Sequence, residues 1–179
     1  SWSAIAMDKD GNVLTNTPIW MDTRAQSICD RLNEEIGADK IFEVSGNSLQ
    51  PSYTTAKILW YKENMPEVYE KIDKILQSNS FIAYKLTGVM SQDVSQGYGL
   101  HCFDMRRAVW DEAMCRRLGI PLEFLPEICD CDHIVGTVTE KAAEEAGLAA
   151  GIPVVAGGLD AACGTLGAGV IHPGETQEQ

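Results

Sequence analysis

Residues 152–169 constrain the fold of this chain more than any other stretch. A short apolar run, residues 152–155, leads through Gly157 and Gly158 into a segment of small residues. This order is typical of a buried strand, a glycine turn and a helix packed closely against the sheet. Asp160 stands where the strand gives way to the helix. A carboxylate there is either an N-terminal cap or a chemical group at the end of a strand, where open α/β sheets bind ligands.

The composition is typical of a soluble globular chain and disfavours some functions. Of the 179 residues, 45% are hydrophobic and 22% are charged, which suffices for one domain with a real core or for two small ones. The formal net charge is −12 and no run of Lys or Arg occurs, so nucleic-acid binding is disfavoured. No apolar run is long enough to span a bilayer. We therefore expect a cytoplasmic protein with no nucleic-acid or membrane partner.

Six cysteines are scattered along the chain, a pattern that indicates reduced thiols rather than a disulfide framework. Cys129, Cys131 and His133 follow C-x-C-x-H spacing. A zinc site of this type needs a second pair of ligands, which the sequence lacks. We predict a polar loop here and no metal site.

Apolar periodicity and turn residues predict few strands, widely separated by helices. The predicted strands are residues 2–7, 13–20, 72–76, 134–139 and 152–155, the first two joined by a hairpin turn at 8–12. The predicted helices are residues 22–36, 39–44, 54–64, a short one from 66, 81–86, 110–118, 139–146 and one after 160, with 93–104 as a loop or broken helix. The candidate helix caps are Asp22 or Thr23, Asn79 or Ser80, and Thr139. This order indicates an α/β fold.

Six motifs, in order along nearly the whole chain, resemble the FGGY family of carbohydrate kinases. They are Ile19-Trp20-Met-Asp-Thr-Arg24; Ser52-x-Thr54-x-x-Lys57-Ile-x-Trp60-x-x-Glu63-Asn64; Asp93-Val-Ser95 with Phe103-Asp104 and Trp110-Asp111; Leu118-Gly-Ile-Pro with Leu125-Pro126; Ile134-Val-Gly136; and Gly157-Gly-Leu-Asp160-Ala-Ala. Each is weak alone, but six in family order make a specific match, most similar to xylulokinases and ribulokinases. Tyr61 departs from the family, which usually has an aliphatic residue or Phe there.

The resemblance implies an α/β domain of the ribonuclease-H-like type, as in the actin and hexokinase ATPases, truncated at both ends. Residues 1–179 would form part of the N-terminal, sugar-binding domain, and the first strands, with their phosphate-holding hairpin, would be absent. The C-terminal ATP-binding domain would also be absent. The chain indeed starts without Met and both its ends interrupt apparent strands, so we expect a fragment of a longer protein.

The activity that the resemblance implies is ATP-dependent phosphorylation of a sugar hydroxyl. The substrate would be a ketopentose such as xylulose or ribulose. The cofactors would be ATP and Mg²⁺, bound mainly by segments outside this chain, so the chain alone is expected to be inactive. The implied partners are the sugar and ATP, with a homodimer as one assembly left open.

Asp160 matches the catalytic aspartate of the family, the general base that takes the proton from the sugar hydroxyl. Phosphoryl transfer asks the protein mainly for positioning, charge neutralisation and such a base. A carboxylate is a weak base in bulk water, and we expect partial burial in a cleft to strengthen it. Gly157 and Gly158 are the candidate cofactor-binding residues, because glycine lets a backbone approach a ligand closely.

The substrate-binding positions depart from the family at several points. Trp20 either packs its aromatic face against the sugar or is a core residue at the end of a strand. Trp2 stands where xylulokinases carry the His of a Met-His pair, and Ser52 stands where glycerol kinases have a sugar-contacting Tyr, with Tyr53 beside it. Ala161 replaces the Asn or Gln that commonly follows the catalytic Asp. Such changes affect the choice of sugar more than the reaction type.

Other motif residues are predicted to be structural. Lys57 and Trp60 share one helix face at i and i+3, which favours packing over catalysis. Arg24 either pairs with a neighbouring carboxylate or lies on the surface. Asp93 is predicted to be an N-cap or loop organiser rather than a ligand. His101 shows no partner pattern, and we assign it no role.

Two other function classes are alternatives to a kinase. A Rossmann-type dehydrogenase is disfavoured because no G-x-G-x-x-G turn opens a strand–helix unit. A non-catalytic sugar-binding or regulatory relative would keep the cleft and lose turnover. Only segments outside this sequence distinguish that relative from a working kinase.

Overall fold

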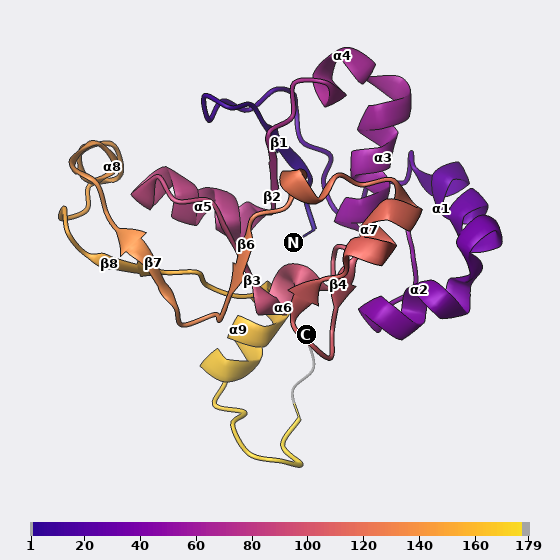
Figure 1. The fold of residues 1–179 in the computed structure, drawn as a ribbon. Helices are drawn as coiled ribbons and strands as arrows, with labels where there is room; N and C mark the ends of the chain where they lie inside the picture. Colours follow the sequence, from indigo (N-terminus) through magenta and orange to yellow (C-terminus); the bar gives the residue numbers. More distant parts are fainter. Residues whose placement is uncertain (1, 177–179) are drawn as a thin grey trace.

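Helices account for most of the regular structure in residues 2–176, the part of the chain that this computed structural model describes (Figure 1). The α-helices are α1 (Gln26–Leu32), α2 (Ala38–Ser45), α3 (Thr54–Asn64), α4 (Pro66–Tyr69), α5 (Ser78–Thr87), α6 (Val94–Gly97), α7 (Glu112–Leu118), α8 (Glu140–Ala146) and α9 (Asp160–Gly167). A π-helical turn, η1 (Asn33–Gly37), joins α1 to α2, and a 3₁₀ turn, η2 (Leu122–Phe124), follows α7. No helix among these residues has the length and apolar character needed to cross a membrane.

The strands are short and pair two by two. They are β1 (Ile5–Met7), β2 (Lys74–Leu76), β3 (Ser91–Asp93), β4 (Phe103–Asp104), β5 (Val109–Trp110), β6 (Glu127–Cys129), β7 (Ile134–Thr137) and β8 (Pro153–Val155). Within the described residues, β1–β2, β4–β5 and β7–β8 are antiparallel pairs and β3–β6 is a parallel pair. Helices α1 to α4 and α7 gather on one side of β1, whereas α5, α8 and the β7–β8 pair gather on the other (Figure 1).

The predicted partner strand at residues 13–20 is wrong. The predicted turn at residues 8–12 is present, and in it Gly11 N–H donates to the Asp8 carbonyl at 3.0 Å. Beyond the turn, however, only an isolated bridge joins Met7 to Val13, and β1 pairs along its length with β2. Pro18 lies inside the predicted strand and offers no N–H to a ladder, which disfavours regular pairing there.

Local capping signals place most helix ends correctly. Helix α3 covers the predicted residues 54–64, and Thr139 caps α8 by accepting a hydrogen bond from Ala142 N at 3.2 Å. The predicted caps, Asp22 or Thr23 for the first helix and Asn79 or Ser80 for the helix near 81–86, are wrong, because Ala25 and Gln77 occupy these cap positions. The Asp22 carboxylate binds Arg24 instead, so α1 begins only at Gln26. Helix α5 begins at Ser78, so Asn79 lies inside its first turn.

The largest core cluster lies between α1, α2, α3 and α7 and includes Ile28, Ile41, Ile58 and Leu118, all nearly inaccessible to solvent. Helices α1 and α7 turn one apolar side inward, whereas α3 is buried over most of its surface. Tyr61 joins this core to the chain before β1, since its hydroxyl donates to the Ala4 carbonyl at 2.9 Å. The core thus fixes the N-terminal segment that carries Trp2.

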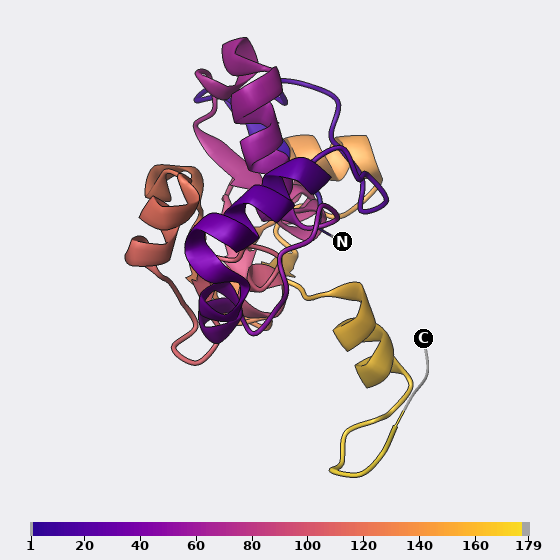
Figure 2. The same ribbon diagram turned by 90° about the vertical axis from the view of Figure 1, so that its right-hand side faces the viewer.

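The prediction of a buried last strand and a closely packed last helix is wrong. Pro153 and Val155 of β8 are exposed, and α9 has no buried residue. Both views show α9 standing apart from the body of the chain (Figures 1 and 2). Small side chains let a helix pack closely, but they bury little apolar area and so provide little force to draw it in. The position of α9 therefore depends on contacts at its first turn.

Candidate active site

A cavity of about 410 Å³ lies at the start of α9, and Asp160 is on its wall. Its other lining residues are Trp2, Trp20, Tyr98, Leu159 and Ala161. Four of the predicted site residues, Trp2, Trp20, Asp160 and Ala161, therefore come together from opposite ends of the sequence. A volume of a few hundred Å³ is sufficient for a small ligand.

Asp160 is the first residue of α9, and Leu159 occupies the cap position before it. The carboxylate is thus not the N-terminal cap of its own helix. Asp160 is exposed, so the predicted partial burial is wrong for this chain. It lines a second, smaller hollow as well, together with Asn79, Gln96 and Gly158. A carboxylate that borders open space on the cavity wall is accessible to a ligand's hydroxyl group.

Aromatic rings form one wall of the cavity. The Trp2 ring centroid lies 4.4 Å from that of Tyr53 and 5.6 Å from that of Tyr98. Tyr53 is not a lining residue; it packs against Trp2 and donates its hydroxyl proton to Asn47 Oδ1 at 3.1 Å. Trp20 is 57% exposed, which rules out a core role for its side chain. Its contact with a sugar stays a prediction.

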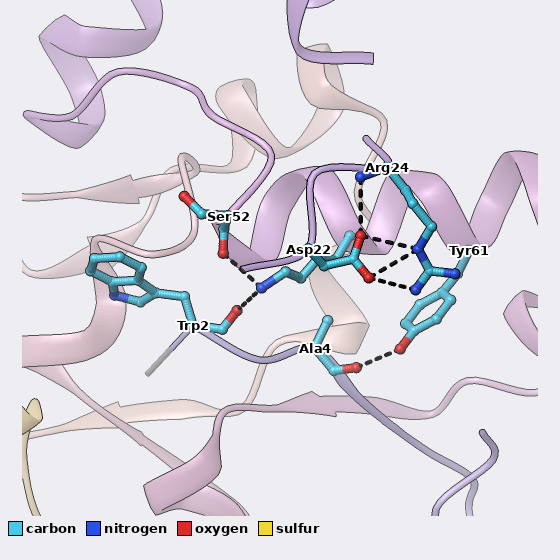
Figure 3. Close-up of polar contacts among 7 residues, drawn as sticks. Trp2, Ala4, Asp22, Arg24, Ser52 and Tyr61 are labelled. Carbon is cyan, nitrogen blue, oxygen red and sulfur yellow. Dashed lines mark hydrogen bonds and ion pairs between the residues drawn. The ribbon is translucent and has the colours of Figure 1, made fainter. Parts of the chain in front are cut away.

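Lys57 anchors the backbone on either side of this wall. Its side chain is buried, and Nζ donates to the Trp2 carbonyl and to the Ser52 carbonyl, each at 2.6 Å (Figure 3). Burial lowers the pKa of Lys57 to about 8, and the Asp22 carboxylate partly opposes this shift. The predicted structural role of Lys57 agrees with these contacts. Ser52 contributes its carbonyl here and does not line the cavity.

The segment after Trp20 is held by an ion pair. Arg24 donates Nε and Nη2 hydrogen bonds to the Asp22 carboxylate at 2.6 to 3.0 Å, and the bonds lower the pKa of Asp22 (Figure 3). The Arg24 guanidinium also lies 4.2 Å from the ring centroid of Trp60. Arg24 thus realises the predicted pairing with a carboxylate while remaining partly exposed. Together these contacts join the segment after Trp20 to α3.

The two predicted cofactor-binding glycines shape the turn before Asp160. Gly157 has φ of 82°, a conformation that favours glycine, and its N–H donates to the Cys131 carbonyl at 3.0 Å. A Cβ at Gly158 would lie 3.2 Å from Cys163 Sγ and 3.3 Å from Ser95 Oγ. The backbone conformation thus favours glycine at position 157, and the close contacts of the turn favour it at position 158. Their role toward a cofactor stays a prediction.

Tyr98 is a cavity residue that the sequence interpretation missed. It lies between Gly97 and Gly99, and a Cβ at Gly99 would come within 2.6 Å of the Trp2 ring. An aromatic residue between two glycines that allow close contacts is the signal that could have identified it. Burial raises the pKa of Tyr98, and the neighbouring Tyr53 and the Asp160 carboxylate add to this shift. The phenol therefore stays neutral and can donate a hydrogen bond into the cavity.

Comparison with known proteins places these residues in a family. Residues 2–167 match the N-terminal domain of the FGGY family of carbohydrate kinases. Xylulose kinase of Bacillus subtilis (strain 168) is 31% identical over 172 residues, 96% of this chain and 34% of the relative. L-fuculokinase of Escherichia coli (strain K12) is 29% identical over 163 residues, 91% of this chain and 34% of the relative.

The crystal structure of xylulose kinase from Rhodospirillum rubrum superimposes with a TM-score of 0.91 at 26% identity, covering 96% of this chain and 36% of that one. This similarity confirms the predicted α/β fold class of the ribonuclease-H-like type. The chain spans about a third of the length of the curated relatives it matches. From the match over residues 2–167, the chain belongs to the FGGY family of carbohydrate kinases.

Proposed function

We propose that the full-length protein is an ATP-dependent kinase that phosphorylates a hydroxyl of a small sugar, with Asp160 as the general base. The supporting observation is that the Asp160 carboxylate shares one cavity with the aromatic side chains of Trp2, Trp20 and Tyr98. Aromatic faces pack against the C–H faces of a sugar, and a carboxylate accepts the proton of a hydroxyl group. The relatives named xylulose kinase favour a ketopentose, xylulose or ribulose, as the substrate.

The residues of the cavity would divide the work of the reaction. The attacking hydroxyl would donate a hydrogen bond to the Asp160 carboxylate, which takes the proton as the hydroxyl oxygen bonds to the γ-phosphorus, the bond from that phosphorus to the bridging oxygen breaks and ADP leaves. Tyr98, held neutral, donates to a second sugar oxygen and thereby orients the ring or chain of the substrate. The methyl group of Ala161 leaves space where a longer amide would stand, so it shapes the pocket for the substrate.

ATP and Mg²⁺ fit this proposal as groups held mainly by the rest of the full-length protein. Across residues 2–176, no group of three or more His, Cys, Asp and Glu side chains is placed to hold a metal ion. Mg²⁺ would neutralise the charge that is transferred with the phosphoryl group. We assign this chain the sugar-binding part of the N-terminal domain. Gly157 and Gly158 would allow the phosphates to approach the turn closely.

Replacing the base tests the proposal. In the full-length protein, Asp160→Asn keeps the side-chain shape but removes the proton acceptor, so we expect kcat to fall about 10²- to 10⁴-fold. The melting temperature should not change, because Asp160 is exposed. ADP release with xylulose and with ribulose measures turnover. Asp39→Asn, at an exposed carboxylate of α2, is the control that should keep wild-type turnover.

Two results would contradict the proposal. Near-normal turnover of Asp160→Asn would show that another group takes the proton. Failure of the wild-type protein to phosphorylate any ketopentose, aldose or polyol with Mg²⁺-ATP would indicate the non-catalytic sugar-binding relative instead.

A further inference from the structure

A buried polar network lies under the start of α9. Its centre is Asp93, the last residue of β3, which is 1% exposed. Asp93 Oδ1 accepts hydrogen bonds from Gln96 N at 3.0 Å and from Ser95 Oγ at 2.5 Å. Asp93 Oδ2 accepts from Asn79 Nδ2 at 2.5 Å. The Gln96 bond confirms the predicted N-cap role of Asp93, but the other bonds go beyond what a cap requires.

Ser95 connects this network to the start of α9, the helix that begins at Asp160. Its Oγ accepts a hydrogen bond from Leu159 N at 2.8 Å, and Leu159 is the residue before Asp160. A hydroxyl group has a single proton, so donation to Asp93 leaves a lone pair of Ser95 Oγ facing the Leu159 N–H. The buried Asp93 carboxylate thus orients the Ser95 hydroxyl group toward Leu159. Leu159 is 64 residues away from Ser95, so the link is a tertiary contact.

This link matters because α9 has few other attachments in the described chain. None of its residues is buried. The backbone bonds of the preceding turn, from Ala156 N to the His133 carbonyl and from Gly157 N to the Cys131 carbonyl, hold the loop three or four residues before Asp160. The Ser95 bond to Leu159 acts one residue before it. Ser95 therefore holds the chain at the residue directly before Asp160.

We infer that Asp93 and Ser95 are positioning residues for Asp160, linking the start of α9 to β3 and α6. The inference rests on the proposed function, in which Asp160 is the general base. Neither residue needs to touch the sugar, since neither lines the cavity that holds Trp2 and Trp20. The hydrogen bond between Ser95 and Leu159 instead determines the position of the Asp160 carboxylate. A shift of about 1 Å in a catalytic group costs about 10²-fold in rate.

Ser95 variants of the full-length protein test this inference. Ser95→Ala removes the link, and we expect kcat to fall about 10- to 100-fold. KM for the sugar should change by less than about threefold, because the cavity walls are untouched. Ser95→Thr keeps the hydroxyl group and should restore kcat to within about threefold of wild type. Ser45→Ala is the control, because Ser45 is another serine whose hydroxyl makes hydrogen bonds, here buried in α2 rather than half-buried beside α9; it should lose stability and keep kcat.

The outcomes separate the two proposals. If Ser95→Ala keeps wild-type kcat while Asp160→Asn is inactive, the positioning role is wrong and the base assignment stands. If Asp160→Asn keeps its turnover, the proposed function itself fails. Should Ser95→Ala not fold, Ser95→Cys decides, because a thiol has nearly the same shape but is a weak donor and acceptor. A lowered kcat in Ser95→Cys supports the link, and a wild-type kcat overturns it.

Discussion

His101 is a buried histidine whose two ring nitrogens both have partners. Its side chain is inaccessible to solvent, Nδ1 lies 3.1 Å from Thr55 Oγ1, and Nε2 lies 3.1 Å from the Ser48 carbonyl. Because the Ser48 carbonyl can only accept, Nε2 carries the proton of the neutral ring, and Nδ1 accepts from the Thr55 hydroxyl group. The arrangement satisfies the neutral ring. The ring also packs edge-on against Tyr53, behind Trp2 of the cavity wall.

We expect His101 to make folding sensitive to acid. Burial lowers its pKa from 6.5 to about 4, so the unfolded chain binds more protons between these pH values. Stability is therefore complete above pH 6.5 and is lost as the pH falls toward 4, by at most about 3 kcal/mol. Urea unfolding at several pH values measures this loss. In His101→Gln, the free energy of unfolding should fall less between neutral pH and pH 4 than in wild type. In His133→Gln, which changes an exposed histidine, it should fall as steeply as in wild type. Equal slopes for all three proteins would contradict the prediction.

Elements that rest on local signals could be predicted from sequence, and elements that rest on distant contacts could not. Thr139 and the left-handed Gly46 mark the start of α8 and the end of α2 within a few residues of chain. The partner of β1 carries no such signal, since Ile5 pairs with Leu76 far along the sequence. The expected burial of α9 failed for a related reason, because burial depends on what the rest of the molecule places against a helix.

Some residues of the candidate site could likewise be predicted from the sequence, and others could not. The family motifs identify Asp160 and Ala161, and the structure places both on one cavity wall with Trp2 and Trp20. Tyr98 lies in a segment without periodicity, where the two flanking glycines are the one local signal, and its packing against Trp2 places it at the cavity. The link from Ser95 to Leu159 likewise spans two segments that share no local pattern. Contacts of this kind require the tertiary structure.

Replacement of two helical glycines by alanine should change the stability of the protein in opposite directions. A Cβ at Gly97, in α6, would lie 2.8 Å from ring atoms of the buried Phe103, so Gly97→Ala should destabilise the protein by about 1–3 kcal/mol. A Cβ at Gly167, at the end of α9, would meet nothing within 4 Å. Gly167→Ala should therefore be neutral or stabilise by up to about 1 kcal/mol. Chemical denaturation compares the two variants, and equal stabilities would show that α6 does not pack tightly on Phe103.

Exposed apolar side chains are unevenly distributed over the molecule. The main core lies among α1, α2, α3 and α7, whereas the β7–β8 pair and the last helix expose large apolar residues. Ile134 is 57% exposed and Leu166 is 65% exposed. Figure 1 shows these elements on the side of the chain away from that core. Apolar surface of this kind usually meets another part of a protein.

We expect the remainder of the full-length protein to cover α9, because the curated relatives are about three times as long as this chain. Hydrogen exchange of the full-length protein and of residues 1–179 alone measures this. Amides of α9 should exchange quickly in the shorter protein, since an exposed helix of eight residues is marginal, and slowly in the longer one. Helix α3, whose residues are mostly buried, is the internal reference and should be protected in both. Equally fast exchange of α9 in the two proteins would show that Asp160 stands on a helix that the rest of the full-length protein leaves uncovered.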